Sequence, residues 1–185
     1  MKTSVILKMT SATSPAPQVV TCGSQSPSCL AWKAFDKRID DFYSCWSPLS
    51  KSDWIKINLG EQKVVNCLNI TNYHKGSGPI NFTLQGSNDD KTYVNLKSVT
   101  EISWTSDRET KTYILNRNEK YQYYKWNVGP NISGTSAHIA ELDLLYDDEM
   151  HVPSQKIKKD VINEIKNTLD KYSDSILLVN IEGDN

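Results

Sequence analysis

The clearest structural signal in the chain is the run Trp54-Ile55-Lys56-Ile57-Asn58-Leu59-Gly60, in which apolar and polar residues alternate from Ile55 onward. Successive side chains of a β-strand point to opposite faces of the sheet, so Ile55, Ile57 and Leu59 would share one buried face. Gly60 interrupts the pattern, and we expect the strand to end there. The run therefore predicts a half-buried strand of an antiparallel sheet.

Similar short runs recur along the chain. They are rich in β-branched and aromatic residues, which suit pleated, half-buried surfaces, and turn residues separate them. The predicted strands cover residues 64–73, 81–85, 93–99, 112–115, 121–128 and 139–146, and Val5-Ile6-Leu7 is a candidate first strand. Short strands at this spacing predict an all-β sandwich or barrel.

The pattern changes after residue 149. Apolar residues then recur every three or four positions, which predicts an amphipathic helix beginning after Ser154, and residues 176–181 read as a strand. We therefore expect a binding domain at 1–149 and a helix-plus-strand tail at 150–185. A helix with one apolar stripe is rarely stable alone in water. It would dock on the sandwich, on a copy of the chain, or on another protein subunit, and we expect an oligomer or a part of a larger assembly. The stripe consists of Ile157, Val161, Ile165, Leu169 and Tyr172.

Composition excludes several function classes. The net charge of −1 argues against a nucleic-acid partner, which normally requires a basic excess. No apolar run reaches the roughly 20 residues of a transmembrane helix, and the N-terminus lacks the apolar stretch of about 7–15 residues of a secretory signal. No phosphate-binding loop or nucleophile elbow appears, so we expect no enzyme activity.

The four cysteines do not indicate a zinc site, because no pair has the CxxC spacing and the histidines lie elsewhere in the sequence. They are expected to be small buried apolar residues. A disulfide such as Cys22–Cys29 would require an oxidising environment.

Five segments, in order, resemble the discoidin family, also called coagulation factor 5/8 type C or galactose-binding-like domains. The resemblance spans about residues 15–147 and implies an antiparallel jelly-roll β-sandwich whose loops bind sugars, phospholipid headgroups or proteins. It places Trp32, Trp46, Trp54 and Trp126 at or beside core positions. The segments are Ala34-Phe35-Asp36 with Cys45-Trp46-Ser47, then Trp54 to Gly60, Phe82-Thr83-Leu84-Gln85-Gly86-Ser87-Asn88-Asp89, Tyr123-Tyr124-Lys125-Trp126, and Ile139-Ala140-Glu141-Leu142-Asp143-Leu144-Leu145-Tyr146.

The N-terminal stretch is also similar to modules of bacteriophage tail and baseplate proteins. That similarity implies an extracellular or virion-associated protein without a cleaved signal peptide. The function we expect is recognition of cell-surface carbohydrate as part of a phage tail-like particle or surface assembly. Two alternatives stay open: a protein–protein assembly module with no glycan ligand, and a phospholipid-headgroup binder.

The resemblance also implies a structural calcium ion, which prefers six to eight oxygen ligands. Two departures from the family pattern bear on it: Lys37 replaces a glycine, and the segment from Asp36 to Trp46 is three residues longer than usual. The alternative is that the two carboxylates only accept backbone N–H bonds. The implied ligands are the carboxylates of Asp36 and Glu141, the carbonyls of Lys33 and Ala140, Ser44 in place of a threonine, and Arg38 or Asp40/Asp41 for the remaining position.

Sugar recognition needs an aromatic surface and fixed polar groups, usually on loops. The loop from Tyr73 to Pro79 offers an aromatic ring, an imidazole and an ammonium in Tyr73, His74 and Lys75. Its alternative is a plain solvated hairpin loop. Phe42 and Tyr43, in the longer loop at 39–43, are either exposed contacts or lids over the core. Trp104 is a further candidate near a loop end.

Overall fold

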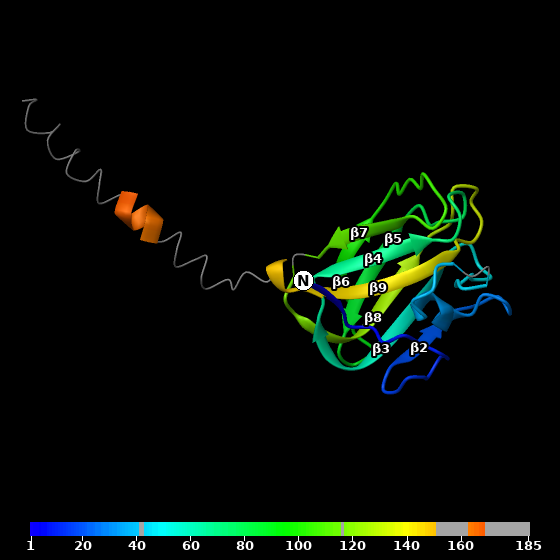
Figure 1. Ribbon diagram of the computed structural model, residues 1–185, viewed down its shortest axis with the longest axis horizontal. Coiled ribbons are helices and arrows are strands. Elements are labelled where there is room, and N and C mark those ends of the chain that lie inside the picture. The colour runs from blue at the N-terminus through cyan, green and yellow to red at the C-terminus, as the bar shows by residue number, and fades with distance from the viewer. Residues whose placement is uncertain (41–42, 116, 151–162, 169–185) are drawn as a thin grey trace, which may run out of the picture. The chain divides into compact units, whose positions relative to one another are not determined.

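Two antiparallel β-sheets packed face to face form the first of the two units of the chain, Met1–Asp147 (Figure 1). The structure is a computed structural model and describes residues 1–40, 43–115, 117–150 and 163–168. The second unit is Asp148–Asn185. The predicted all-β sandwich of the jelly-roll type is confirmed.

The larger sheet has five strands in the order β2-β3-β8-β5-β6 and the smaller has four in the order β1-β9-β4-β7. All neighbouring strands are antiparallel. The strands are β1 (Lys2–Ser4), β2 (Val19–Cys22), β3 (Asp53–Val64), β4 (Cys67–Asn72), β5 (Phe82–Ser87), β6 (Val94–Val99), β7 (Thr110–Ile114), β8 (Lys120–Val128) and β9 (Ile139–Asp147); the 3-10 turns are η1 (Ala31–Phe35) and η2 (Asp148–Met150).

The core lies between the two sheets and uses alternate residues of each strand, as the period of two requires. Ile55 and Ile57 of β3 lie opposite Trp126 and Tyr124 of β8 in the register, and all four are buried. The ring of Phe35, from η1, packs on Trp126 with centroids 5.8 Å apart.

The tryptophans divide into two groups. Trp46 and Trp126 are fully buried, and Trp32 is partly buried against the core. Trp54 alternates with the buried Ile55, and the ammonium groups of Lys56 and Lys125 lie over its indole ring.

The structure corrects two predicted strand boundaries. β3 does not end at Gly60, which has φ +81° and continues the strand through a register shift between Asn58 and Lys63. A glycine without a Cβ tolerates this left-handed backbone, and the side-chain carbonyl of Asn58 accepts its N–H. At the N-terminus the strand is Lys2–Ser4, not Val5–Leu7. There the Gln18 side chain bonds the Val5 carbonyl and the Leu7 N–H, where a strand partner would otherwise do so.

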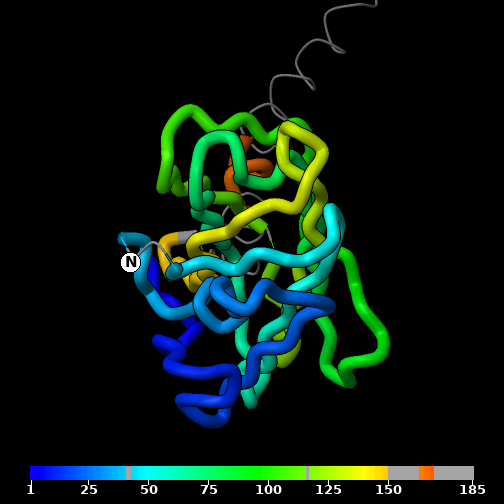
Figure 2. The backbone as a smooth tube through the Cα atoms, turned by 90° about the vertical axis from the view of Figure 1, so that its right-hand side faces the viewer, coloured from blue at the N-terminus to red at the C-terminus, as the bar shows by residue number. Residues whose placement is uncertain are grey.

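Four long connections gather at one end of the sandwich, residues 23–52, 73–81, 100–109 and 129–138 (Figures 1 and 2). Backbone hydrogen bonds join three of them. The Tyr73 N–H donates to the carbonyl of His138, and the His138 N–H donates to that of Ser77. The Ile102 N–H donates to the carbonyl of Ile80. These bonds fix the loops against one another.

Part of the predicted tail helix lies in the described residues. Residues 163–168 are helical, the Thr168 hydroxyl donates to the carbonyl of Glu164, and Ile165 is 53% exposed. The rest of that helix and the predicted strand at 176–181 lie outside the described residues. In the ranges that the structure describes, no helix has the length and apolar character needed to cross a bilayer.

We expect Leu84→Ala to lower the free energy of unfolding by about 2–5 kcal/mol, because Leu84 is fully buried between the sheets and its loss leaves a cavity. The matched control is Leu49→Ala, at a side chain 71% exposed, which should change it by about 0.5 kcal/mol or less. Urea unfolding measures both variants. Equal losses would contradict the assignment of Leu84 to the core.

Candidate functional site

A buried asparagine at the end of β4 holds the turn before β7 in place. Asn72 is fully buried; its amide N–H donates to the carbonyl of Ser106 and its side-chain oxygen accepts the N–H of Glu109. The Glu109 carboxylate in turn accepts from Thr105 and from the Lys111 ammonium. The pKa of Glu109 is lowered to about 2 by these donors, Lys111 first. The turn is therefore rigidly tied to the smaller sheet.

This turn places Asp107 beside the predicted ligand loop. The Asp107 carboxylate accepts the Lys75 backbone N–H at 2.8 Å and lies 3.0 Å from Nδ1 of His74. Both side chains are about half exposed, at 53% and 55%. The Lys75 N–H and the His74 imidazole hold the pKa of Asp107 below its usual range. A positioned imidazole and carboxylate thus face solvent together.

Arg108 covers the ring of Tyr73. Its guanidinium lies 3.9 Å from the ring centroid, within the range of a cation–π contact. Tyr73 is only 6% exposed, and burial raises the pKa of its hydroxyl. Its ring therefore supports Arg108 and does not lie open at the surface. Arg108 has a left-handed backbone, φ +56°, which is uncommon for a residue with a Cβ.

Trp104 packs against the loop that carries His74 and Lys75. Its indole N–H donates to the Pro79 carbonyl at 3.0 Å, and the Lys111 ammonium lies 5.2 Å from its ring centroid. Gly78 packs directly on the indole: a Cβ at that position would lie 2.3 Å from Nε1. The close approach requires a glycine at 78.

Together these loops present fixed donors, acceptors and an aromatic wall. We name His74, Lys75, Trp104, Asp107 and Arg108 the loop cluster. Guanidinium and carboxylate groups make stronger hydrogen bonds than neutral partners, and sugar hydroxyls can both donate to the carboxylate and accept from the cations.

The structure brings together most of the ligand residues predicted from sequence, but not all. His74, Lys75 and Trp104 belong to the loop cluster, with Tyr73 beneath it. Tyr43 is 51% exposed, with the Lys33 ammonium 6.0 Å from its ring centroid. Phe42 lies outside the described residues.

Sequence reasoning did not single out Asp107 and Arg108. The available signal was the charged stretch Asp107-Arg108-Glu109 between two predicted strands. Its position beside the 73–81 loop depends on the pairing of β4 with β7, which sequence alone did not reveal.

Several of the implied calcium ligands also meet. Asp36 is buried; its carboxylate accepts the Ser44 hydroxyl at 2.6 Å and the Arg38 N–H at 2.9 Å. Glu141 accepts the Lys37 N–H at 3.1 Å. The two bonds from the Arg38 and Lys37 N–H groups are those expected if the carboxylates only accept backbone N–H bonds and hold no calcium. Lys33 lies in η1, and Ala140 is buried in β9 next to Glu141.

The Glu141 carboxylate is short of compensating partners. It is 8% exposed, and its Oε1 atom accepts no hydrogen bond. Burial, with the nearby Asp36 and Asp143 charges, raises the pKa of Glu141 to about 9, although Lys37 opposes this. The Lys37 ammonium lies 3.8 Å from Oε1 and 2.7 Å from Asp143. A nearby cation would stabilise the charged form of such a carboxylate. The negative charges of Asp36 and Glu141 would therefore suit a calcium ion.

Few side chains are available as calcium ligands near Asp36 and Glu141. Among the described residues, no three His, Cys, Asp or Glu side chains form a group that could hold a metal ion. A calcium ion here would depend on carbonyl oxygens for most of its ligands. Lys37 adopts φ +59° where the family has glycine, which keeps the backbone shape of the loop.

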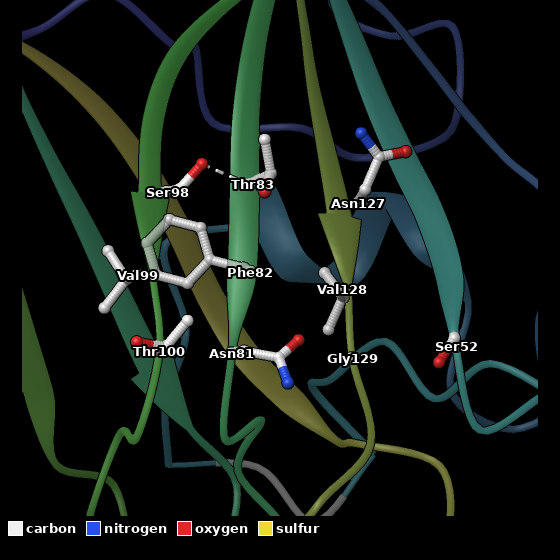
Figure 3. Close-up of a pocket in the computed structure, with 10 residues that line it drawn as sticks. All are labelled: Ser52, Asn81, Phe82, Thr83, Ser98, Val99, Thr100, Asn127, Val128 and Gly129. Carbon is white, nitrogen blue, oxygen red and sulfur yellow. Dashed lines mark hydrogen bonds between the residues drawn. The ribbon is translucent and has the colours of Figure 1, made fainter.

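A shallow depression of about 300 Å³ lies at the same end of the larger sheet (Figure 3). Its walls come from Ser52 and from β5, β6 and β8 with their adjoining residues, and they include the Thr83–Ser98 hydrogen bond drawn there. Its one aromatic lining residue, Phe82, is 2% exposed. The depression has no charged side chain in its lining, so the loop cluster is the stronger candidate.

We expect Gly78→Ala to lower stability by about 1–3 kcal/mol and to displace Trp104, because the added methyl overlaps the indole. Gly76→Ala is the matched control in the same loop, since a Cβ at Gly76 meets nothing within 4 Å. Urea unfolding and tryptophan fluorescence measure the two effects. The same behaviour in both variants would show that Trp104 does not pack on Gly78.

Comparisons with known proteins agree with this fold. A module from Clostridium perfringens, CpGH89CBM32-5, solved with GalNAc-β-1,3-galactose, aligns with TM-score 0.59 at 19% identity, over 69% of this chain and 94% of that one. The family 32 carbohydrate-binding module of C. perfringens NanJ, solved with galactose, gives 0.56 at 19%, over 70% and 93%. Chitosan-binding module 1 from a Paenibacillus sp. IK-5 chitosanase/glucanase gives 0.59 at 17%, over 78% and 99%.

No match is found among curated proteins. The sequence model of a family described as a NedA-like, galactose-binding domain of the F5/8 type C group matches residues 33–125, or 93 of the 185 residues. On this match the chain belongs to the F5/8 type C family, as a NedA-like, galactose-binding domain.

Proposed function

We propose that the chain is a non-catalytic carbohydrate-binding module and that the loop cluster holds the sugar. The observation that carries the proposal is the meeting of His74, Asp107 and Arg108 at one loop end, with Asp107 fixed by the Lys75 N–H and Arg108 lying on Tyr73. Groups that are positioned before the ligand arrives lose less entropy on binding.

The chemistry favours a hexose or hexosamine. Its hydroxyls would pair with the Asp107 carboxylate and the Arg108 guanidinium, and the C–H face of its ring would lie on an aromatic side chain such as Trp104. The complexes of the similar structures with galactose and with GalNAc-β-1,3-galactose support this class of ligand.

We expect Arg108→Gln to weaken binding of galactose about tenfold or more, because a hydrogen bond to a charged group contributes about 1.5–3 kcal/mol. Arg117→Gln is the matched control, at an arginine in the β7–β8 connection at the opposite end of the sandwich. Calorimetric titration with galactose, and with a chitosan oligosaccharide, measures both. If galactose binds saturably and Arg108→Gln does not change its affinity, the sugar does not bind at the loop cluster.

We also propose that Asp36 and Glu141 hold a structural calcium ion. The ion would offset two buried carboxylates and join the η1 loop to β9, using the carbonyls of Lys33 and Ala140 and the Ser44 hydroxyl; Arg38 or Asp40/Asp41 would supply the remaining ligand. The support is the buried Oε1 of Glu141, which accepts no hydrogen bond.

If calcium binds there, saturating CaCl₂ should raise the melting temperature by several degrees over a chelator, since a ligand at about 100 times its Kd adds about 2.7 kcal/mol. Glu141→Gln should abolish that rise, whereas Glu61→Gln, at a carboxylate of β3 that is 66% exposed, should keep it. An identical melting temperature with and without calcium would contradict the calcium proposal. Lys37 would then be the cation that offsets the Glu141 charge.

We extend the proposal to the setting in which the module acts. The tail at 150–185 would dock on another protein subunit of a phage tail-like particle or surface assembly, outside the cell or on the virion. The exposed Ile165, one of the apolar stripe residues, supports a partner for that face.

A further inference from the structure

Two cysteines that are sixteen positions apart in the sequence meet at the loop end of the sandwich. The Sγ atoms of Cys29 and Cys45 are 2.8 Å apart, and both residues are free thiols. Cys45 is 1% exposed, whereas Cys29 is partly exposed. A disulfide needs about 2.05 Å between its sulfurs, so closing the pair requires a movement below about 1 Å.

The backbone already holds these two segments together. The Ser47 N–H donates to the Cys29 carbonyl, and the Ser26 N–H donates to the Ser47 carbonyl. On the same segments the Trp46 indole N–H donates to the Ser24 carbonyl at 3.0 Å, and the Leu49 N–H donates to the Ser24 hydroxyl at 2.9 Å. The thiols are therefore held in contact by the fold and not by a chance rotamer.

We propose that Cys29 and Cys45 form an intramolecular disulfide when the protein meets an oxidising thiol–disulfide couple. The bond closes the loop between Cys29 and Cys45, which carries η1, Asp36 and Ser44. The predicted pairing of Cys22 with Cys29 is replaced, because the structure brings Cys45 into contact with Cys29, while the Cys22 thiol contacts Gln25.

The reaction balances with glutathione disulfide as the oxidant. The partly exposed Cys29 attacks one sulfur of glutathione disulfide, forms a mixed disulfide and releases one glutathione thiolate. Cys45 then gives up its proton, attacks Cys29 Sγ and releases the second glutathione. The two protein thiols lose two electrons and two protons, and the two glutathione molecules take them up.

The other two thiols have no such partner in the described part of the chain. Cys67 is buried in β4, and Cys22 lies at the end of β2, where its sulfur is 3.7 Å from the Gln25 side-chain oxygen. They are the internal controls, because both should remain thiols under conditions that oxidise Cys29 and Cys45.

Peptide mapping of the full chain tests the proposal. The protein is incubated with glutathione disulfide, free thiols are alkylated, and trypsin is added. One linked pair is expected, of Met9–Lys33 with Ile39–Lys51, with Cys22 alkylated. Its mass should lie two hydrogen atoms below the sum of these two peptides with Cys29 and Cys45 as unmodified thiols. Because Met9–Lys33 contains both Cys22 and Cys29, two variants identify the sulfur: Cys22→Ser should keep the link, and Cys29→Ser should abolish it.

Thermal unfolding gives a second readout. The oxidised wild type and the oxidised Cys22→Ser variant should melt about 5–10 °C above their reduced forms, since the closed loop restricts the unfolded chain. Cys29→Ser should melt at the same temperature in both states. Recovery of both wild-type peptides unlinked and alkylated, or a link that persists in Cys29→Ser, would overturn the proposal. Neither readout involves sugar binding, so the result is independent of the proposed function.

Discussion

The fold depends above all on burying the inner faces of β3 and β8 between the two sheets. Ile55 and Ile57 pair with Trp126 and Tyr124, and this register sets which side of the larger sheet is apolar. Because side chains alternate along a strand, a slip of one residue would move every one of them to the wrong face. The penalty of exposing two isoleucines and two large aromatic rings therefore selects one register for this strand pair.

That register also decides where the loops lie. Once β3, β4, β8 and β9 are fixed, their connections must leave at the same end, and three of them are joined by backbone hydrogen bonds. The site is built on these loops but owes its rigidity to the sheets. Asn72 is the link, since its buried amide belongs to β4 and its partners belong to the turn that carries Asp107 and Arg108. A loop held in this way can present a guanidinium and a carboxylate without first being ordered by the ligand.

The sequence was informative wherever the signal was local. The alternation in 54–59, 121–128 and 139–146 predicted real strands, and the Tyr73–Pro79 loop, which was chosen from sequence as a ligand loop, supplies two residues of the loop cluster, His74 and Lys75. Gly60 was misread because a glycine that ends a strand and one that bends it look the same without the partner strand. Asp107 and Arg108 were missed because their neighbours Tyr73, His74 and Lys75 come from the loop after β4, more than thirty residues earlier. The contact of Cys29 with Cys45 was missed for the same reason: it depends on the backbone pairing of 26–29 with 45–47, which has no sequence signature.

The connection from Gly23 to Ser52 is the segment that most needs additional support. Loops longer than about 12–15 residues are uncommon in compact domains unless something holds them. Here the inner part of the loop is held at several places by different forces: Phe35 packs on Trp126, Asp36 and the backbone of Lys37 bond across to Ser44 and Glu141, and Trp46 pairs with Ile139 at the start of β9. The packing does not depend on ions or redox conditions, whereas the proposed calcium ion would act through the carboxylates and the proposed disulfide through the two thiols. If both proposals hold, the same loop carries two sources of stability that depend on the environment, and both would be strongest in a calcium-containing, oxidising one. Both proposed sources of stability belong to the contacts of one long loop and not to the sandwich itself.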